Sequence, residues 1–249
     1  MRFIESLDEV PEGETVLFSA HGVAPRVREQ AVARSLKVID ATCPFVARAH
    51  RQVREFAEHG VPVVIVGDVL HVEVVGLVGE YKETGGDGDG SDGRNIQVVK
   101  DAADVAALPF PADVPVGVVC QTTLSSGAVT RVLSALRARY PRLIEPSAAE
   151  TCTATRDRQR AVGDFVRGSD PSVTGVLVVG SANSSNTARL VEIAREAGAV
   201  AWRLDGPKDL PECDFAGIKR LGLTAGASTP ESVVAEIVFA FDGKGGDVL

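Results

Sequence analysis

Short runs of β-branched and other apolar residues alternate along this chain with segments whose apolar residues recur at helical spacing. Such alternation predicts βαβ units and mainly parallel sheets, because a parallel pair of strands needs a crossover connection that is usually a helix. Ligands in such folds gather at the carboxyl ends of the strands. The expected strands are residues 16–19, 38–40, 61–67, 96–99, 116–120, 176–180, 199–203 and 221–224. The expected helices are residues 26–34, 44–58, 127–139, 153–166, 185–197 and 231–241.

A weak internal repeat organises this alternation. A cysteine stands at a predicted helix start at Cys43 and again at Cys152, and a strand follows each helix. The repeat predicts an α/β protein of repeated small subdomains rather than one continuous sheet. The predicted parts are a first (1–42), a second (43–150), a third (151–241) and a tail (242–249).

Within the second part, residues 82–95 are rich in Gly and Asp and are expected to form a flexible surface loop. The aspartates do not follow the calcium-binding loop pattern, because Asp92 stands where that pattern needs Gly and Val98 where it needs Glu. A loop insertion is therefore the favoured interpretation.

Composition narrows the class of protein. The formal net charge of −8 argues against a nucleic-acid-binding surface, and an apolar content of 45% is ordinary for a globular chain. No apolar run reaches the length of a membrane-spanning helix, and residues 1–9 lack the apolar stretch of a signal peptide. Four widely spaced cysteines do not suggest a disulfide framework. We therefore expect a cytoplasmic protein without nucleic-acid or membrane partners.

The two cysteines at predicted helix starts are candidate metal ligands. A helix N-terminus carries unpaired N–H groups and the positive end of the macrodipole, and both favour the thiolate. Pro44, directly after Cys43, suits a first helical position. Two buried structural thiols are the alternative. Because motifs suited to a phosphate-bearing ligand surround both cysteines, the metal interpretation is favoured.

Polar residues follow the expected strands at three further places in the first half of the chain. His21 can donate a hydrogen bond to a phosphate or can be an ordinary turn residue. His71 and Glu73, two residues apart in expected irregular structure, can approach one bound group, the imidazole binding it and the carboxyl delivering a proton. Their alternative is an exposed polar pair at a loop–helix junction. Thr122, in a hydroxyl cluster, can position a substrate hydroxyl or belong to a helix cap.

The strongest anion-binding signal lies in the second half. Ser184, Ser185 and Asn186 lie between the Gly180 strand end and a predicted helix, and Ser228 occupies a similar strand-to-helix turn. Helix N-termini of this kind bind phosphates. The absence of the Walker lysine disfavours a nucleoside triphosphatase. Together with His21, the two turns can hold one diphosphate.

In sequence order these motifs resemble the 4-hydroxy-3-methylbut-2-enyl diphosphate reductase family, over nearly the whole chain. The segments that carry the resemblance are residues 18–23, 40–44, 121–123, 184–186 and 224–228. The resemblance implies a trefoil of three small α/β domains around a [4Fe-4S] cluster. It also implies a two-electron reductive dehydroxylation of an allylic diphosphate, giving isopentenyl and dimethylallyl diphosphates in the non-mevalonate isoprenoid pathway. The electrons would come from a reduced ferredoxin or flavodoxin.

The resemblance also implies roles for individual residues. Cys43 and Cys152 would be cluster ligands, Glu73 would supply protons, and Thr122 and His71 would organise the substrate hydroxyl. The diphosphate would be held by His21, Ser184, Asn186 and Ser228, with Ser185 a neighbour in the same turn.

The chain departs from the family pattern at its start. Family members carry a first cluster cysteine and a further substrate-facing histidine ahead of the segment that matches here. We therefore expect a truncated start, an exposed sheet edge near residues 16–19, and no third cysteine ligand in this chain. Val72 also stands where the family usually has proline. The alternative function is a non-catalytic remnant that binds diphosphate but cannot hold an intact cluster, and a third possibility is a complex in which another polypeptide supplies the missing cysteine.

Overall fold

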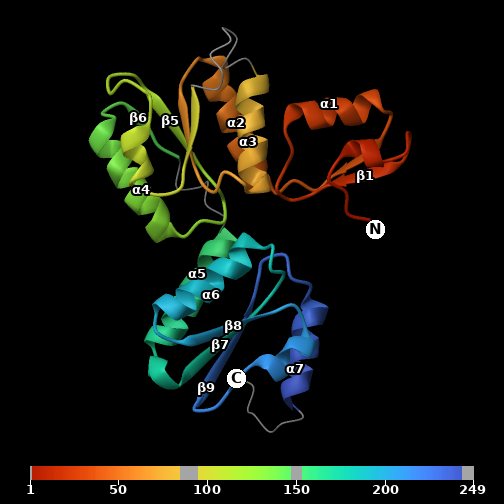
Figure 1. Ribbon diagram of the computed structural model, residues 1–249, viewed down its shortest axis with the longest axis vertical. Coiled ribbons are helices and arrows are strands. Elements are labelled where there is room, and N and C mark those ends of the chain that lie inside the picture. The colour runs from red at the N-terminus through yellow and green to blue at the C-terminus, as the bar shows by residue number, and fades with distance from the viewer. Residues whose placement is uncertain (1, 85–94, 147–152, 243–249) are drawn as a thin grey trace. The chain divides into compact units, whose positions relative to one another are not determined.

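The computed structural model describes residues 2–84, 95–146 and 153–242, in which the strands form three separate sheets (Figure 1). Every described pair of strands is parallel, so the expectation of an α/β fold with parallel sheets is confirmed. The chain divides into two compact units, one of residues 1–122 and 126–151 and the other of residues 123–125 and 152–249. The subdomain boundaries expected after residues 42, 150 and 241 stay predictions.

The first sheet of the first unit has two strands, β1 (Thr15–Phe18) and β2 (Lys37–Asp40), connected through helix α1 (Pro25–Ala33). One face packs on the 3-10 helix η1 (Leu7–Glu9) and on α1, and it buries Val16 and Phe18. On the other face Leu17 and Ile39 are partners in register and are 47% and 54% exposed. An apolar face is thus left uncovered beside the sheet edge that the sequence predicted to be exposed.

The second sheet of this unit has the strand order β4-β3-β5-β6. Helices α2 and α3 pack together on one of its faces, and the core between them includes Val53, Ile65 and Leu77. The elements are α2 (Pro44–Glu58), β3 (Val63–Val66), α3 (Val72–Glu83), β4 (Ile96–Val99), η2 (Asp104–Ala107), β5 (Val116–Cys120), α4 (Ser126–Arg139) and β6 (Leu143–Ile144).

Helix α3 corrects two sequence expectations. Residues 71–73 were expected in irregular structure, and 82–95 as a loop, yet the helix begins at Val72 and ends at Glu83. Valines and glycines give this segment a low intrinsic helix propensity, so local pattern did not reveal it. Packing compensates, because Val74, Leu77 and Tyr81 share one face and are fully buried. Residues 85–94 of the expected loop lie outside the described residues.

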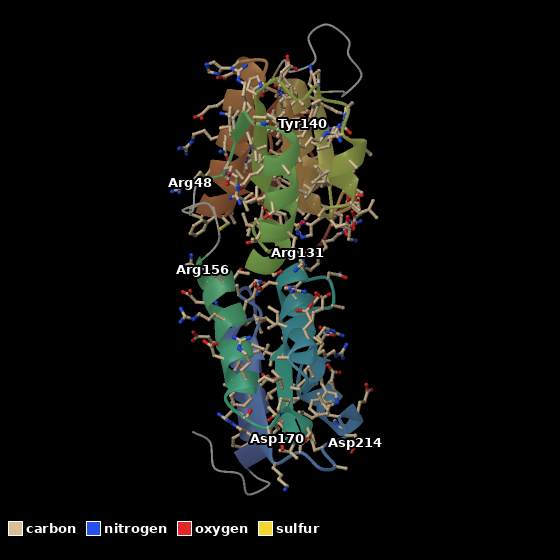
Figure 2. All side chains as sticks on the ribbon, turned by 90° about the vertical axis from the view of Figure 1, so that its left-hand side faces the viewer. Arg48, Arg131, Tyr140, Arg156, Asp170 and Asp214 are labelled. Atoms are coloured by element: carbon tan, nitrogen blue, oxygen red, sulfur yellow. The ribbon has the colours of Figure 1, made fainter. Side chains whose placement is uncertain are left out.

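The C-terminal end of α4 is anchored by its last arginine and the tyrosine that follows. Arg139 donates hydrogen bonds to the carbonyl oxygens of Val105 and Leu108, at 2.7 and 2.6 Å. Tyr140, labelled in Figure 2, is fully buried and donates to the Phe110 carbonyl at 3.4 Å. These contacts hold the β5–α4–β6 crossover, whose short last strand the sequence did not predict.

The second unit is a three-layer sandwich around a sheet of order β8-β7-β9 (Figure 1). Central β7 is buried along its whole length, with Val176 and Val178 facing α5 and α6, while Leu177 and Val179 face α7. No helix in the described part of the chain is long and apolar enough to cross a membrane. The elements are α5 (Thr153–Arg167), η4 (Pro171–Val173), β7 (Thr174–Val179), α6 (Ser185–Glu196), β8 (Val200–Leu204), η5 (Pro207–Glu212), β9 (Arg220–Ala225) and α7 (Glu231–Asp242).

Candidate functional site

Three of the predicted site residues of the first unit follow strand ends. His21 lies in the turn after β1, His71 caps helix α3 after β3, and Thr122 follows β5. The rings of His21 and His71 meet edge to face with their centroids 5.4 Å apart. The structure therefore brings together two histidines that are fifty positions apart in the sequence.

Glu73 lies in the first turn of α3 with its side chain completely buried. The Thr122 backbone N–H donates to Glu73 Oε1 at 2.7 Å, and the Thr122 hydroxyl donates to Oε2 at 3.0 Å. Burial raises the pKa of Glu73, while the Thr122 hydrogen bonds and the charge of His50 oppose that rise. A buried carboxyl with a raised pKa is suited to hold a proton and release it to a bound group.

His71 is held in one tautomer by its capping role. Its Nδ1 accepts the backbone N–H of Glu73 at 3.2 Å, so the proton of the neutral ring belongs on Nε2. Burial lowers the pKa of His71, and the nearby His21 lowers it further against a smaller opposing effect of Asp68. Burial likewise lowers the pKa of His21. Both rings are therefore neutral near pH 7 and act as hydrogen-bond donors rather than cations.

The raised pKa of Glu73 predicts a stability cost that depends on pH. A carboxyl whose pKa is higher in the folded than in the unfolded chain stabilises the fold only while protonated, so the free energy of unfolding falls as pH rises through the shifted pKa. We expect Glu73→Gln to be more stable than the parent chain near pH 8, by ~1.4 kcal/mol for each unit of the shift, and close to it near pH 4. Urea denaturation at the two pH values measures this difference, and an equal difference at both would contradict it.

In the second unit the turn after β7 has the features of an anion site. Ser184 is the N-cap of α6, and its hydroxyl accepts the Thr187 backbone N–H at 3.3 Å. Asn186 is only 5% exposed, yet neither Oδ1 nor Nδ2 of its amide has a hydrogen-bond partner. Leaving such a buried group unpaired costs about 1–3 kcal/mol, so the amide is placed to receive a polar ligand.

Neighbouring glycines make room for this turn. A Cβ on either Gly180 or Gly226 would lie 2.4 Å from the Thr187 hydroxyl oxygen, so a larger residue at either position would force Thr187 to move. Gly226 donates its N–H to Val179 at 2.8 Å, which places the turn after β9 beside the turn after β7. Ser184, Ser185 and Asn186 therefore lie on one turn, and exposed Ser228 lies on its neighbour.

Cys43 is the N-cap of α2, as the sequence predicted, with Pro44 at the first helical position. Its thiol is half-buried and makes no capping hydrogen bond. Cys152 lies outside the described residues, and Cys120 is half-buried at the end of β5. Among the residues that the structure describes, no group of three or more His, Cys, Asp or Glu is arranged to hold a metal ion.

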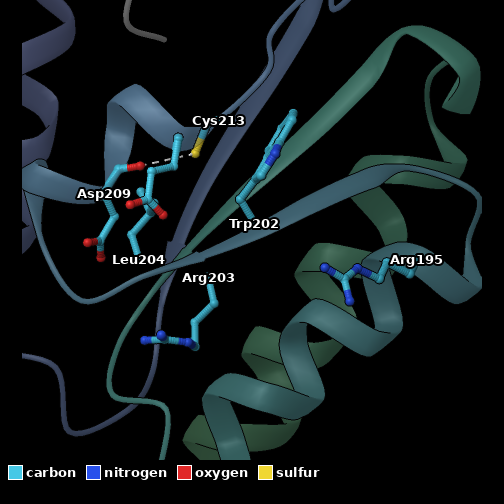
Figure 3. A pocket seen from close by; sticks show the side chains of 7 residues that line it. Arg195, Trp202, Arg203, Leu204, Asp209 and Cys213 are labelled. Atoms are coloured by element: carbon cyan, nitrogen blue, oxygen red, sulfur yellow. Dashed lines mark hydrogen bonds between the residues drawn. The ribbon is translucent and has the colours of Figure 1, made fainter.

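Cys213 lies in the loop between η5 and β9. It caps η5, is half-buried beside the α7 core, and its Sγ donates to the Asp209 carbonyl at 3.7 Å (Figure 3). Burial raises the pKa of the Cys213 thiol, and the charges of Asp209 and Glu212 raise it further. It lines a cavity of about 260 Å³ together with Trp202 and other residues, and its raised pKa keeps the thiol neutral.

Sequence reasoning missed a buried ion pair in the first unit. His50 Nδ1 lies 2.8 Å from Glu80 Oε2, and the Arg54 guanidinium lies 2.7 Å from Glu80 Oε1. The only sequence signal was that His50 and Arg54 are four residues apart on a predicted helix. Their partner lies on α3, which the sequence did not predict.

Parallel sheets with buried polar groups at the carboxyl ends of their strands define an α/β protein built to bind a small polar ligand. Residues 1–242 match the family described as LytB protein. The chain belongs to the LytB family.

Named relatives are reductases. The 4-hydroxy-3-methylbut-2-enyl diphosphate reductase of Pseudomonas aeruginosa is 43% identical over 236 residues, which are 95% of this chain and 72% of the relative. The enzyme of the same name from Cutibacterium acnes is 40% identical over 244 residues, 98% of this chain and 71% of the relative. The solved structure of the E-1-hydroxy-2-methyl-but-2-enyl-4-diphosphate reductase from Plasmodium falciparum matches with a TM-score of 0.84 and 32% identity, covering 96% of this chain and 70% of that one. The resemblance and the fold class drawn from the sequence are confirmed.

Proposed function

We propose that this chain catalyses the two-electron reductive dehydroxylation of 4-hydroxy-3-methylbut-2-enyl diphosphate to isopentenyl and dimethylallyl diphosphates. The relatives that carry this name support the proposal. The observation that carries it is the buried Glu73 carboxyl hydrogen-bonded twice to Thr122, beside two neutral histidines. Loss of an allylic hydroxyl as water needs a proton source of this kind.

In the proposed reaction the substrate's C–O bond breaks, a new C–H bond forms and water leaves, which consumes two electrons and two protons. Glu73 would deliver a proton to the departing oxygen, since its buried carboxyl is suited to remain protonated until substrate binds. The Thr122 hydroxyl and the Nε2–H of His71 would orient the substrate hydroxyl. Confining these groups away from water strengthens each hydrogen bond.

The diphosphate would be bound at the turns of the second unit. The buried, unpartnered amide of Asn186 and the N-terminus of α6 would receive phosphate oxygens, with Ser184, Ser185 and Ser228 supplying hydroxyl groups. His21 would donate a further hydrogen bond as a neutral imidazole. Hydrogen bonds from neutral groups, rather than cationic side chains, would then carry most of the binding.

A [4Fe-4S] cluster, when bound, would supply the electrons, delivered by a reduced ferredoxin or flavodoxin. Cys43 fits such a group, because its half-buried thiol stands at a helix N-terminus and makes no capping hydrogen bond. Cys152 would be a second ligand. Two thiolates are fewer than such clusters take in proteins, so cluster retention is the first property to measure.

The proposal is tested by anaerobic reconstitution with iron and sulfide, followed by measurement of iron per chain and of substrate turnover with a chemical one-electron reductant. A stable four-iron cluster and formation of both products are expected. Cluster retention without turnover would refute the proposed reaction. Failure to retain iron, together with intact pyrophosphate binding, would identify the non-catalytic diphosphate-binding alternative.

The diphosphate site makes a separate prediction. Asn186→Leu, which removes the unpaired amide and keeps a similar side-chain volume, should weaken binding of inorganic pyrophosphate about tenfold or more while leaving the free energy of unfolding unchanged or higher. Calorimetric titration and urea denaturation measure the two effects. The matched control is Asn183→Leu, an exposed position in the same turn, where little change in affinity is expected. Equal affinities for the two variants would remove Asn186 from the site.

A further inference from the structure

A group of three charged or titratable side chains joins helices α2 and α3; His50 and Glu80 are buried, and Arg54 is half-exposed. Arg54 and His50 of α2 both contact the carboxylate of Glu80 on α3, His50 through Nδ1 at 2.8 Å and Arg54 through Nε at 2.8 Å. His50 is 6% exposed and Glu80 is 2% exposed. Burial alone would raise the pKa of Glu80, but the hydrogen bonds from His50 and Arg54 outweigh it and hold that pKa below its usual value. Glu80 is therefore an ionised carboxylate that holds the proton on His50 Nδ1.

The Arg54–Glu80–His50 group lies on the same face of α3 as Glu73, the proton donor of the proposed reaction. Glu73, Gly76 and Glu80 are spaced i, i+3 and i+7, so they share one face of α3. Gly76 leaves the space for the imidazole, because a Cβ there would lie 3.3 Å from His50 Cε1 and Nε2. The His50 ring thus lies on the helix face between its partner Glu80 and Glu73, one turn from the latter.

The opposite side of the imidazole reaches the His21 turn. A Cβ on Gly22 would lie 2.8 Å from His50 Nε2, and Gly22 has a positive φ of 72° that favours glycine in any case. Nε2 itself is buried and has no hydrogen-bond partner. A purely structural ion pair would not need an imidazole whose second nitrogen is left unsatisfied at a cost.

We propose that His50 is a positioning residue that sets when Glu73 holds its proton, acting across Gly76 from the Arg54–Glu80–His50 group. This inference rests on the proposed function, in which Glu73 is the proton donor. A positive imidazolium on this face favours the carboxylate of Glu73 and opposes the effect of burial.

The other groups near Glu73 do not supply this control. Thr122 donates two hydrogen bonds to the Glu73 carboxyl but does not titrate in this range. His71 accepts a hydrogen bond from the Glu73 backbone N–H and not from its carboxyl. The charges of His21 and Asp68 shift the pKa of His71. Of the described side chains that titrate or carry charge around Glu73, His50 is the one whose charge acts on its carboxyl.

The test is a pH titration of the Glu73 carboxyl by NMR in chain labelled with ¹³C at glutamate, with Glu73→Gln identifying the signal. His50→Gln should raise the titration midpoint of Glu73 by about half a unit to one unit, because it removes a positive charge. The matched control is His59→Gln, an exposed histidine at the end of the same helix, which should leave the midpoint unchanged. In active enzyme, the alkaline limb of the turnover profile should move upward by the same amount.

Two outcomes would overturn the proposal. One is an unchanged Glu73 midpoint in folded His50→Gln, which would reduce His50 to a structural ion pair. The other is an equal shift of the Glu73 midpoint in folded His50→Gln and in the control His59→Gln. Neither measurement needs a cluster, a substrate or turnover. An inactive chain would therefore refute the proposed function without deciding the role of His50.

Discussion

The Glu73→Gln variant should lose about 10²- to 10⁴-fold of its turnover rate while still binding pyrophosphate and any cluster that the parent chain retains. Glutamine has nearly the same shape, and its amide oxygen can accept one of the two hydrogen bonds from Thr122. It carries no proton at that position that could be transferred to a departing hydroxyl. The defect should therefore appear in kcat, with KM little changed.

Two measurements make this result specific. Glu58→Gln, an exposed carboxyl at the end of α2, should turn over at the parent rate. The lost rate in Glu73→Gln should accompany the higher stability expected near pH 8, which would separate lost chemistry from lost folding. A Glu73→Gln enzyme that keeps the parent rate would remove Glu73 from the mechanism.

Cys43→Ser should lower the iron retained after anaerobic reconstitution by at least about tenfold. Removing a residue that only hydrogen-bonds to a metal ligand already lowers metal affinity or activity by about this factor, and removing a ligand itself should cost no less. The hydroxyl of serine is a poor ligand for iron in such clusters, which select thiolates. Serine is, however, a favoured helix N-cap, so α2 should form as well or better. Iron and sulfide analysis, with circular dichroism to follow folding, measures the two effects.

The matched control is Cys213→Ser. This thiol is half-buried beside the α7 core, and burial and two nearby carboxylates keep it protonated. Its replacement should leave the iron content unchanged. If Cys43→Ser and Cys213→Ser retained iron equally, Cys43 would be a structural thiol, the alternative that the sequence left open.

Local pattern was sufficient for much of the fold. Expected strands 96–99 and 116–120 and helix 44–58 coincide with β4, β5 and α2, because each combines strong apolar periodicity with clear end signals. The positions of Cys43 at a helix start and Ser184 before α6 were also predictable, since a cap depends on a few neighbouring residues. Helix α3 was not, because its valines and glycines form a helix only when packed against α2.

The chemistry of the candidate site was decided mainly by tertiary structure. The sequence by itself determined which residue types follow the strand ends, and so it named Glu73, Thr122 and Asn186 as candidates. Only the fold decided that Glu73 and Thr122, 49 positions apart, share two hydrogen bonds in a buried setting, and that the Asn186 amide is left unpaired. Burial and long-range hydrogen bonds fix protonation and ligand affinity, and both depend on which strand ends the crossovers bring together.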